Sequence, residues 1–125
     1  MPITVHAHTS LENNDFRRQL ERLYDVSPEF ADGQAAMTQL EQSLTQDTLL
    51  YTAQFNSKLI GAICCRQQGK QCVLEYIVVH PANRGRGVAE RLVSEVCRMQ
   101  KEQGTEQFQP GCGAIQRCLT ALNEA

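Results

Sequence analysis

A strand, a short loop and a helix follow one another in the second half of the chain, and this succession constrains the fold more than any other feature. Residues Val73–His80 are largely apolar and include the β-branched pair Val78-Val79, which is typical of a buried strand. The helix that follows is predicted from apolar residues at helical spacing, namely Val88, Leu92, Val96 and Met99. Between the two lies Arg84-Gly85-Arg86-Gly87. The chain therefore passes from a buried strand into an amphipathic helix through a loop rich in arginine and glycine.

This loop has the chemistry of an anion site. The first amides of a helix lack an intrahelical partner, and the helix dipole adds partial positive charge at the same end. Gly85 and Gly87 carry no side chain that would block an anion, while Arg84 and Arg86 add formal charge. We therefore expect a diphosphate site here. A glycine-rich turn with solvated arginines is the alternative, because G-x-G before a helix is a weak signal by itself.

Two other nucleotide-binding folds are disfavoured. The second glycine is not followed by the Lys-Ser/Thr pair of a P-loop, and no βαβ unit with a later acidic residue follows the loop. The remaining periodicity first predicts a strand at Ile3–Ala7 and two helices. The first helix carries apolar residues from Phe16 to Tyr24 and would be capped by Asn13, Asn14 or Asp15, and the second is marked by Met37, Leu40 and Leu44. A hairpin of strands Leu49–Phe55 and Leu59–Cys65 follows, Gly104 is expected to end the helix after the loop, and a weak strand near Phe108 and a helix at Ala114–Leu122 complete the order. This order indicates an α/β (α+β) fold with a mixed, mostly antiparallel central sheet flanked by helices.

The length and the net charge of the chain exclude several classes of function. A chain of 125 residues fits one domain, which we expect to span 1–125. A net charge of −2 and a pI of about 5.9 argue against nucleic-acid binding. No apolar run approaches the roughly 20 residues that cross a bilayer, and the first residues do not resemble a signal peptide. We therefore expect a cytoplasmic protein with neither a nucleic-acid nor a membrane partner.

The six cysteines predict neither a metal site nor a disulfide framework. They form no C-x-x-C pair and no Cys/His spacing typical of zinc. Reduced thiols, several of them in the core, are the expectation for a cytosolic chain. His6 and His8 would share one face of a strand, but a solvated strand face is favoured over a metal site.

The loop and the strand before it resemble one enzyme superfamily. Arg84-Gly85-Arg86-Gly87-Val88-Ala89 fits the Q/R-x-x-G-x-G/A motif of the GNAT N-acetyltransferases, and Val78-Val79-His80-Pro81 resembles the V-x-P strand end of that family. The resemblance implies a site for acetyl-CoA or CoA. In it, the amides from Gly85 to Ala89 hold the diphosphate, and the backbone of Ile77 and Val79 pairs with the pantetheine arm. The residues expected at the cofactor are Ile77, Val78, Val79, Arg84, Gly85, Arg86, Gly87, Val88 and Ala89.

The catalytic apparatus is less evident. Glu75 is the candidate general base, because strand periodicity places it on one face with Ile77 and Val79 and puts Tyr76 on the other. A strand-end carboxylate that faces water or pairs with an arginine is the alternative. The tyrosine that serves many GNAT enzymes as an acid would fall near Leu119, where this chain has none. The C-terminus is also short for the family, because the chain stops near Ala125, where the usual last two strands would begin. Either a partner subunit, as in a homodimer, completes the sheet, or the edge stays open to bind another protein, or the acceptor side is rudimentary.

A closer resemblance leaves two functions open. Tyr51–Ala62 and Leu23–Pro28 resemble the PanZ (PanM) subgroup of very small GNAT domains. That resemblance implies a non-catalytic acetyl-CoA sensor that binds the aspartate α-decarboxylase proenzyme and promotes its cleavage. The broader family implies an N-acetyltransferase that moves acetyl from acetyl-CoA to an amine acceptor that the sequence does not identify.

Overall fold

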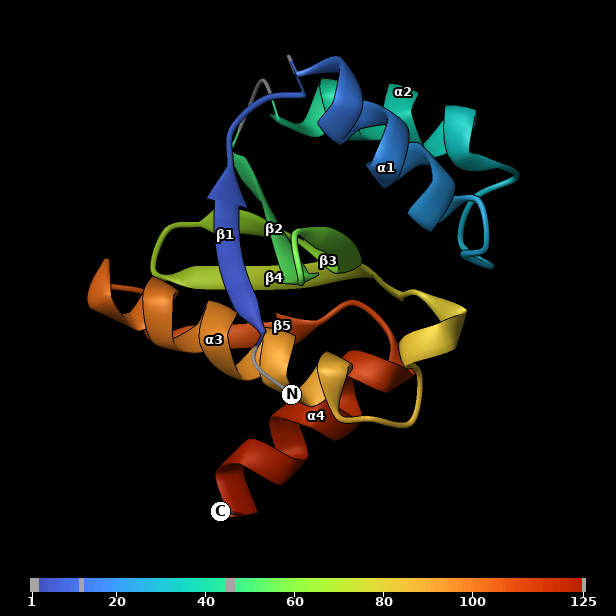
Figure 1. Cartoon of the computed structure of the whole chain (residues 1–125). Coiled ribbons are helices and arrows are strands. Elements are labelled where there is room, and N and C mark those ends of the chain that lie inside the picture. The colour runs from blue at the N-terminus through green and yellow to red at the C-terminus, as the bar shows by residue number, and fades with distance from the viewer. Residues whose placement is uncertain (1–2, 12, 45–46, 125) are drawn as a thin grey trace.

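The computed structural model describes residues 3–11, 13–44 and 47–124 and consists of one sheet with helices on both faces (Figure 1). The sheet has five strands in the order β1-β2-β3-β4-β5. The elements are β1 (Thr4–His8), α1 (Asn14–Tyr24), α2 (Gly33–Leu44), β2 (Thr48–Phe55), β3 (Lys58–Gln68), β4 (Gln71–Val79), the 3-10 turn η1 (Pro81–Asn83), α3 (Val88–Glu102), β5 (Gln107–Pro110) and α4 (Gly113–Glu124).

Strands β1 to β4 pair antiparallel with their neighbours, and only β4 and β5 run parallel. Helices α1 and α2 cover one face of the sheet, and α3 and α4 lie on the other (Figure 1). This arrangement confirms the mixed, mostly antiparallel sheet expected from the sequence. The short β5, predicted only from the surroundings of Phe108, pairs with the first half of β4 alone, from Gln71 to Leu74.

Local sequence signals explain where the helices begin and end. Helix α1 is capped by Asn13, whose side-chain oxygen accepts hydrogen bonds from the amides of Asp15 and Phe16 at 2.9 and 3.1 Å. Helix α3 begins after Gly87 and is followed by Gly104, whose φ of +102° ends it as a glycine after a helix commonly does. None of the helices in the described ranges has the length and apolar content that crossing a membrane would require.

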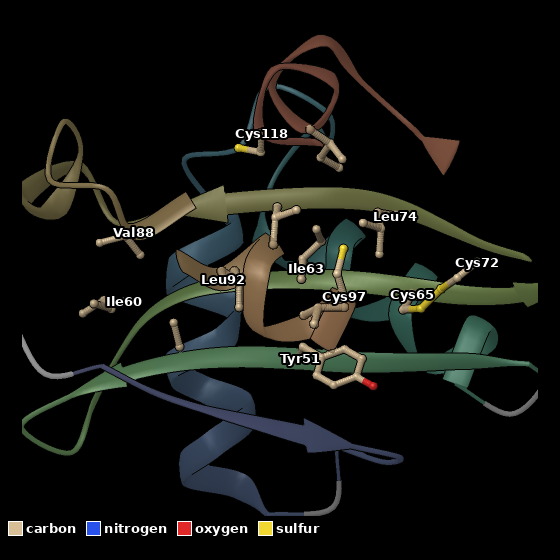
Figure 2. Close-up of a cluster of buried hydrophobic side chains, with 14 residues drawn as sticks. Tyr51, Ile60, Ile63, Cys65, Cys72, Leu74, Val88, Leu92, Cys97 and Cys118 are labelled. Carbon is tan, nitrogen blue, oxygen red and sulfur yellow. A yellow bond between two sulfur atoms is a disulfide. The ribbon is translucent and has the colours of Figure 1, made fainter. Parts of the chain in front are cut away.

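Each face of the sheet has its own core. On the α1–α2 face, Leu20, Tyr24, Leu40 and Cys64 belong to one buried cluster. On the α3–α4 face, Tyr51, Ile63, Leu74, Leu92 and Ile115 belong to the other (Figure 2). The hydroxyl of Tyr51 accepts a 2.6 Å hydrogen bond from Nε2 of the buried Gln100, which gives both polar groups a partner inside this second core.

The expectation of six reduced thiols is wrong for one pair. Cys65 on β3 and Cys72 on β4 form a disulfide inside the second core (Figure 2). Cys65 pairs in register with Leu74, so Cys72 lies diagonally across the hairpin on the same face. The Cα atoms are 6.0 Å apart, which is within the range that a disulfide spans. A search for C-x-x-C spacing misses such a pair, because the hairpin and not the sequence separation brings the two cysteines together.

Candidate functional site

The pairing between β3 and β4 is irregular in the middle of β4. Tyr76 has a φ of +57°, in the left-handed region that non-glycine residues rarely adopt. The β3–β4 register passes from Ala62↔Val78 to Cys64↔Glu75, so Tyr76 and Ile77 together lie opposite the single residue Ile63. Two residues opposite one is a β-bulge, a feature that recurs beside active sites because it redirects side chains.

Because of the bulge, Glu75 lies on the face of the sheet opposite to the one expected. Strict alternation would put Glu75 on one face with Ile77 and Val79, but the extra residue shifts the alternation by one. Ile77 and Val79 pack against the α3–α4 core. Glu75 lies opposite Cys64, and Tyr76 packs against the α1–α2 core, so both side chains project toward α1 and α2. The expectation that Tyr76 faces away from Ile77 is confirmed, whereas the expectation that Glu75 shares the face of Ile77 is wrong.

Side chains from three elements hold the bulge. The hydroxyl of the fully buried Tyr24 on α1 donates a 2.5 Å hydrogen bond to the main-chain carbonyl of Tyr76. The ring of Phe30, between α1 and α2, lies 5.0 Å from the ring of Tyr76. Nε of Arg66 on β3 lies 3.1 Å from Oε1 of Glu75, which forms an ion pair with it. The arginine partner considered as the alternative to a free base at Glu75 is therefore present.

Beyond the bulge, β4 loses its neighbour on the β5 side. The parallel ladder ends at Leu74↔Pro110, and the amide of Gly111 then donates a 2.7 Å hydrogen bond to the carbonyl of Leu74. A Cβ at Gly111 would lie 2.7 Å from that carbonyl oxygen and 2.9 Å from Cβ of Glu75, so only glycine allows this approach. From Glu75 to Val79, the described part of β5 does not cover the edge of β4.

The loop after β4 presents a series of free amides. Gly85 and Gly87 have φ values of +74° and +79°. The first backbone hydrogen bond of α3 joins the amide of Arg91 to the carbonyl of Gly87, at 3.0 Å. Among the described residues, the amides from Gly85 to Glu90 therefore have no backbone acceptor. A Cβ on Gly85 would meet no atom within 4 Å, so this position needs glycine for its backbone conformation and not for space.

A hollow of about 270 Å³ lies in front of these amides. Six of its lining residues were expected at the cofactor: Val79, Arg84, Gly85, Gly87, Val88 and Ala89. Ile77 lies further back on the open edge of β4, and the buried side chain of Val78 belongs to the opposite core. Nε of Arg84 donates a 3.2 Å hydrogen bond to the carbonyl of Val79, so this carbonyl already has a donor. The side chain of Arg86 is exposed and forms no ion pair with any described residue.

Two residues of the hollow were missed by the sequence reasoning. Asn83 ends η1, and Glu90 lies in the first turn of α3. An acidic residue there is favourable for the helix dipole, but its charge also opposes an anion at the same amides. The signal for Glu90 was its place three residues after Gly87. The signal for Asn83 was its place directly before the Arg-Gly loop.

Burial dominates the electrostatics around the bulge. Burial raises the pKa of Tyr24 well above its usual value and also raises that of Cys64, so both stay protonated at neutral pH. Desolvation, and then the nearby charge of Glu75, raises the pKa of Glu29. The described ranges contain no group of three His, Cys, Asp or Glu placed to hold a metal ion. His8 instead stacks on Phe16 and lies 2.9 Å from Oγ1 of Thr52.

Solved structures with the same fold come from several bacterial acetyltransferases. A GNAT family acetyltransferase of Staphylococcus aureus superposes with a TM-score of 0.72 at 19% identity, over 90% of this chain and 88% of that one. A ribosomal-protein-alanine N-acetyltransferase from Brucella melitensis superposes with a TM-score of 0.72 at 14% identity, over 98% of this chain and 89% of that one. An aminoglycoside 6′-N-acetyltransferase complexed with coenzyme A superposes with a TM-score of 0.66 at 20% identity, over 83% of this chain and 57% of that one. At these identities the likeness establishes the GNAT fold.

The sequence comparisons identify the family more narrowly than the solved structures do. A curated relative, the PanD regulatory factor of Salmonella typhimurium, is 38% identical over 56 residues. The matched segment spans 45% of this chain and 44% of that protein, which is less than half of the relative. The model of the family described as "Acetyltransferase (GNAT) domain, PanZ" matches residues 2–110. This match covers most of the chain, including the bulge and the Arg-Gly loop, and the chain therefore belongs to the PanZ family of GNAT acetyltransferase domains.

Proposed function

We propose that the chain binds acetyl-CoA or CoA along the open edge of β4, from the bulge to the hollow before α3. The diphosphate would accept hydrogen bonds from the amides of Gly85 to Ala89, and the pantetheine arm would lie along the open edge at Ile77 and Val79. The other residues proposed at this site are Val78, Arg84, Arg86, Gly87 and Val88.

The observation that carries this proposal is the alignment of two features on one strand. The edge of β4 is uncovered from Glu75 to Val79, and the free amides begin a few residues later. A ligand that joins a polar, amide-containing arm to a diphosphate matches this order. The glycine φ values and the hollow of about 270 Å³ fit the anionic part, because Gly85 and Gly87 place no side chain in front of the amides.

We propose N-acetyl transfer to an amine as the activity of this site. The coenzyme supplies an acyl group activated as a thioester. The contribution of this chain would be to orient that group along β4 and to accept a proton from the attacking amine at the carboxylate of Glu75. Because the bulge turns Glu75 toward α1 and α2, the amine would approach from that face. Arg66 contacts Oε1 of Glu75, and Oε2 of the same carboxylate would serve as the acceptor.

A regulatory function is the second candidate, and the curated relative favours it. That protein is named a PanD regulatory factor, and the family whose model matches this chain is PanZ. Under this alternative the chain would bind acetyl-CoA without turnover and act on the aspartate α-decarboxylase proenzyme as its protein partner. The coenzyme site would be the same, and only the use of the bound ligand would differ.

Two assays separate these candidates. The first measures thiol release from acetyl-CoA with a panel of primary amines, and the second measures capture and cleavage of the aspartate α-decarboxylase proenzyme with and without acetyl-CoA. Turnover that is lost in Glu75→Gln supports the transferase. Absence of turnover, together with proenzyme cleavage that depends on acetyl-CoA, supports the regulator. Absence of turnover and of proenzyme cleavage, together with no binding of acetyl-CoA or CoA, contradicts the whole proposal.

A further inference from the structure

The segment that joins α1 to α2, residues 25–32, lies against the bulge of β4. The ring of Phe30 lies 5.0 Å from the ring of Tyr76 and packs edge-on against the ring of Tyr24, 5.6 Å away. Tyr24 also donates the hydrogen bond to the carbonyl of Tyr76. The segment therefore borders the side of the bulge from which we propose that the amine approaches. We call residues 25–32 the α1–α2 connection.

Hydrogen bonds to two of its own side chains constrain the backbone of the α1–α2 connection. Oδ1 of Asp25 accepts a 2.9 Å hydrogen bond from the amide of Gly33. Oγ of the buried Ser27 accepts a 3.3 Å hydrogen bond from the amide of Glu29. These bonds and the packing of Phe30 fix the chain on both sides of Glu29, whose side chain is exposed and open to a solute.

The carboxylate of Glu29 acts on the groups at the bulge. Burial is the main reason for the raised pKa values of Tyr24, Cys64 and Tyr76, and the negative charge of Glu29 adds to each of them. Burial, and then the charge of Glu75, raises the pKa of Glu29 itself. Because such effects weaken with distance, Glu29 belongs to the same side of the bulge as these groups, in agreement with the position of the neighbouring ring of Phe30.

The charged side chains at Tyr76 leave an excess of negative charge. Three of them act on its hydroxyl, namely Glu75, Glu29 and Arg66. Arg66 is paired with Glu75, whereas Glu29 forms no ion pair with any residue that the structure describes. The unpaired carboxylate follows the rings of Phe30 and Tyr76 along the surface, and the face of an aromatic ring also attracts a cation. An ammonium group therefore suits this position better than a neutral or anionic group.

We infer that the acceptor is an amine that carries a second cationic group, and that Glu29 together with the rings of Phe30 and Tyr76 holds this second group. The inference rests on the proposed transfer. The reacting nitrogen would bond to the acetyl carbon as the C–S bond of the thioester breaks, and its proton would pass to Glu75 and from there to the departing thiolate. The second nitrogen keeps its proton and its charge throughout. Glu29 is thus a specificity-determining residue and takes no part in the proton transfer.

The test compares straight-chain diamines of three to six carbons with the monoamines of the same length, by thiol release from acetyl-CoA. In the unaltered chain, kcat/KM for at least one diamine should exceed that of its monoamine at least tenfold, which is more than the factor of two that two equivalent amines provide. Glu29→Gln should reduce this ratio several-fold, mainly through a higher KM for the diamine. Glu29→Asp should keep part of the preference, because it retains the charge on a shorter side chain.

Glu21→Gln is the matched control. Glu21 lies on α1, and its side chain lies beside Gly33, at the far end of the α1–α2 connection from Tyr76. The substitution makes the same change in net charge as Glu29→Gln and should leave the ratio of diamine to monoamine unaltered. An equal loss of the ratio in Glu21→Gln would show that only the net charge of the protein matters, and would overturn the inference.

A binding measurement separates the inference from the proposed function. With CoA in place of acetyl-CoA no transfer occurs, so calorimetry gives the affinity for the diamine alone. The diamine should bind the unaltered chain several-fold more tightly than Glu29→Gln. This result without turnover of any amine supports the inference and contradicts the transferase. Turnover without a preference for diamines overturns the inference and supports the transferase, and equal diamine affinity in both proteins likewise overturns the inference.

Discussion

The hydroxyl of Tyr24 donates a 2.5 Å hydrogen bond to the carbonyl of Tyr76, the residue at which β4 bulges. This bond connects the buried end of α1 to the point where the sheet opens. A left-handed φ at a tyrosine is unfavourable by itself and persists only where its surroundings hold it. The geometry of the open edge of β4 therefore depends on a side chain that is distant from it in the sequence.

Tyr24→Phe should lower stability and weaken coenzyme binding together. It removes the donor to a main-chain carbonyl in a partly buried site, which should lower the free energy of unfolding by roughly 1–3 kcal/mol. Urea unfolding measures that change, and calorimetry with CoA measures the affinity. Tyr51→Phe is the control, because Tyr51 is also fully buried and loses its bond to Gln100 in the other core. It should reduce stability while the affinity for CoA is retained; a similar loss of affinity in both variants would show that the bulge is not involved.

Glu90→Gln should bind CoA more tightly than the unaltered chain. The substitution removes a negative charge from the wall of the hollow that faces the diphosphate, although it also removes a favourable charge from the first turn of α3. The first effect acts on coenzyme binding and the second on the stability of α3. The affinity for CoA should therefore rise about twofold to fivefold while the free energy of unfolding falls slightly. Glu102→Gln, at the far end of α3, makes the same change in charge and should leave the affinity unchanged. Weaker binding in Glu90→Gln would mean that this carboxylate supports the site.

Glu75→Gln should abolish most transfer to an amine without altering coenzyme affinity. The substitution keeps the shape of the side chain but removes the acceptor for the proton, a role that typically contributes about 10²–10⁴-fold. Steady-state thiol release should show a fall in kcat of that order, with calorimetry as the binding control. Arg66→Met tests the ion pair separately and should lower the rate less than Glu75→Gln. An unchanged kcat in Glu75→Gln would remove this residue from the proposed chemistry.

The thiols should react in an order set by burial. Burial raises the pKa of Cys97 to about 11, so at pH 8 only about one molecule in a thousand carries the thiolate. Cys64 is buried and its pKa is raised as well, whereas Cys112 is only half-buried. Iodoacetamide followed by peptide mass spectrometry should therefore label Cys112 first in the native protein. Cys65 and Cys72 should be labelled only after reduction and unfolding, and their labelling in untreated native protein would contradict the disulfide.

Much of the fold was predictable because each element carries its own local signal. The run Asn13-Asn14-Asp15 marked the start of α1, where Asn13 is the cap, Gly104 marked the end of α3, and alternation marked the β2–β3 hairpin. The glycine loop was predictable too, because Gly85 and Gly87 take positive φ values that few other residues adopt.

Features that depend on contacts between distant segments were not predictable. Tyr76 is a residue type that favours regular strands, so nothing local indicated a bulge, and the face assigned to Glu75 was wrong as a result. The pairing of Cys65 with Cys72 depends on the β3–β4 register. A hollow of about 640 Å³ between α1, the β2–β3 turn and η1 likewise requires these three segments to meet, and no single segment encodes that meeting.

The central claim is that free amides between two arginines bind the diphosphate of a coenzyme, and calorimetry with acetyl-CoA on the glycine variants tests it most directly. Gly85→Ala and Gly87→Ala each force a side chain into a positive φ, whereas Gly69→Ala imposes the same strain at a remote hairpin with a φ of +63°. We expect acetyl-CoA to bind the unaltered chain and the Gly69 variant with similar affinity, and the two loop variants at least tenfold more weakly. Undiminished binding in both loop variants, or no heat with the unaltered chain, would contradict the account.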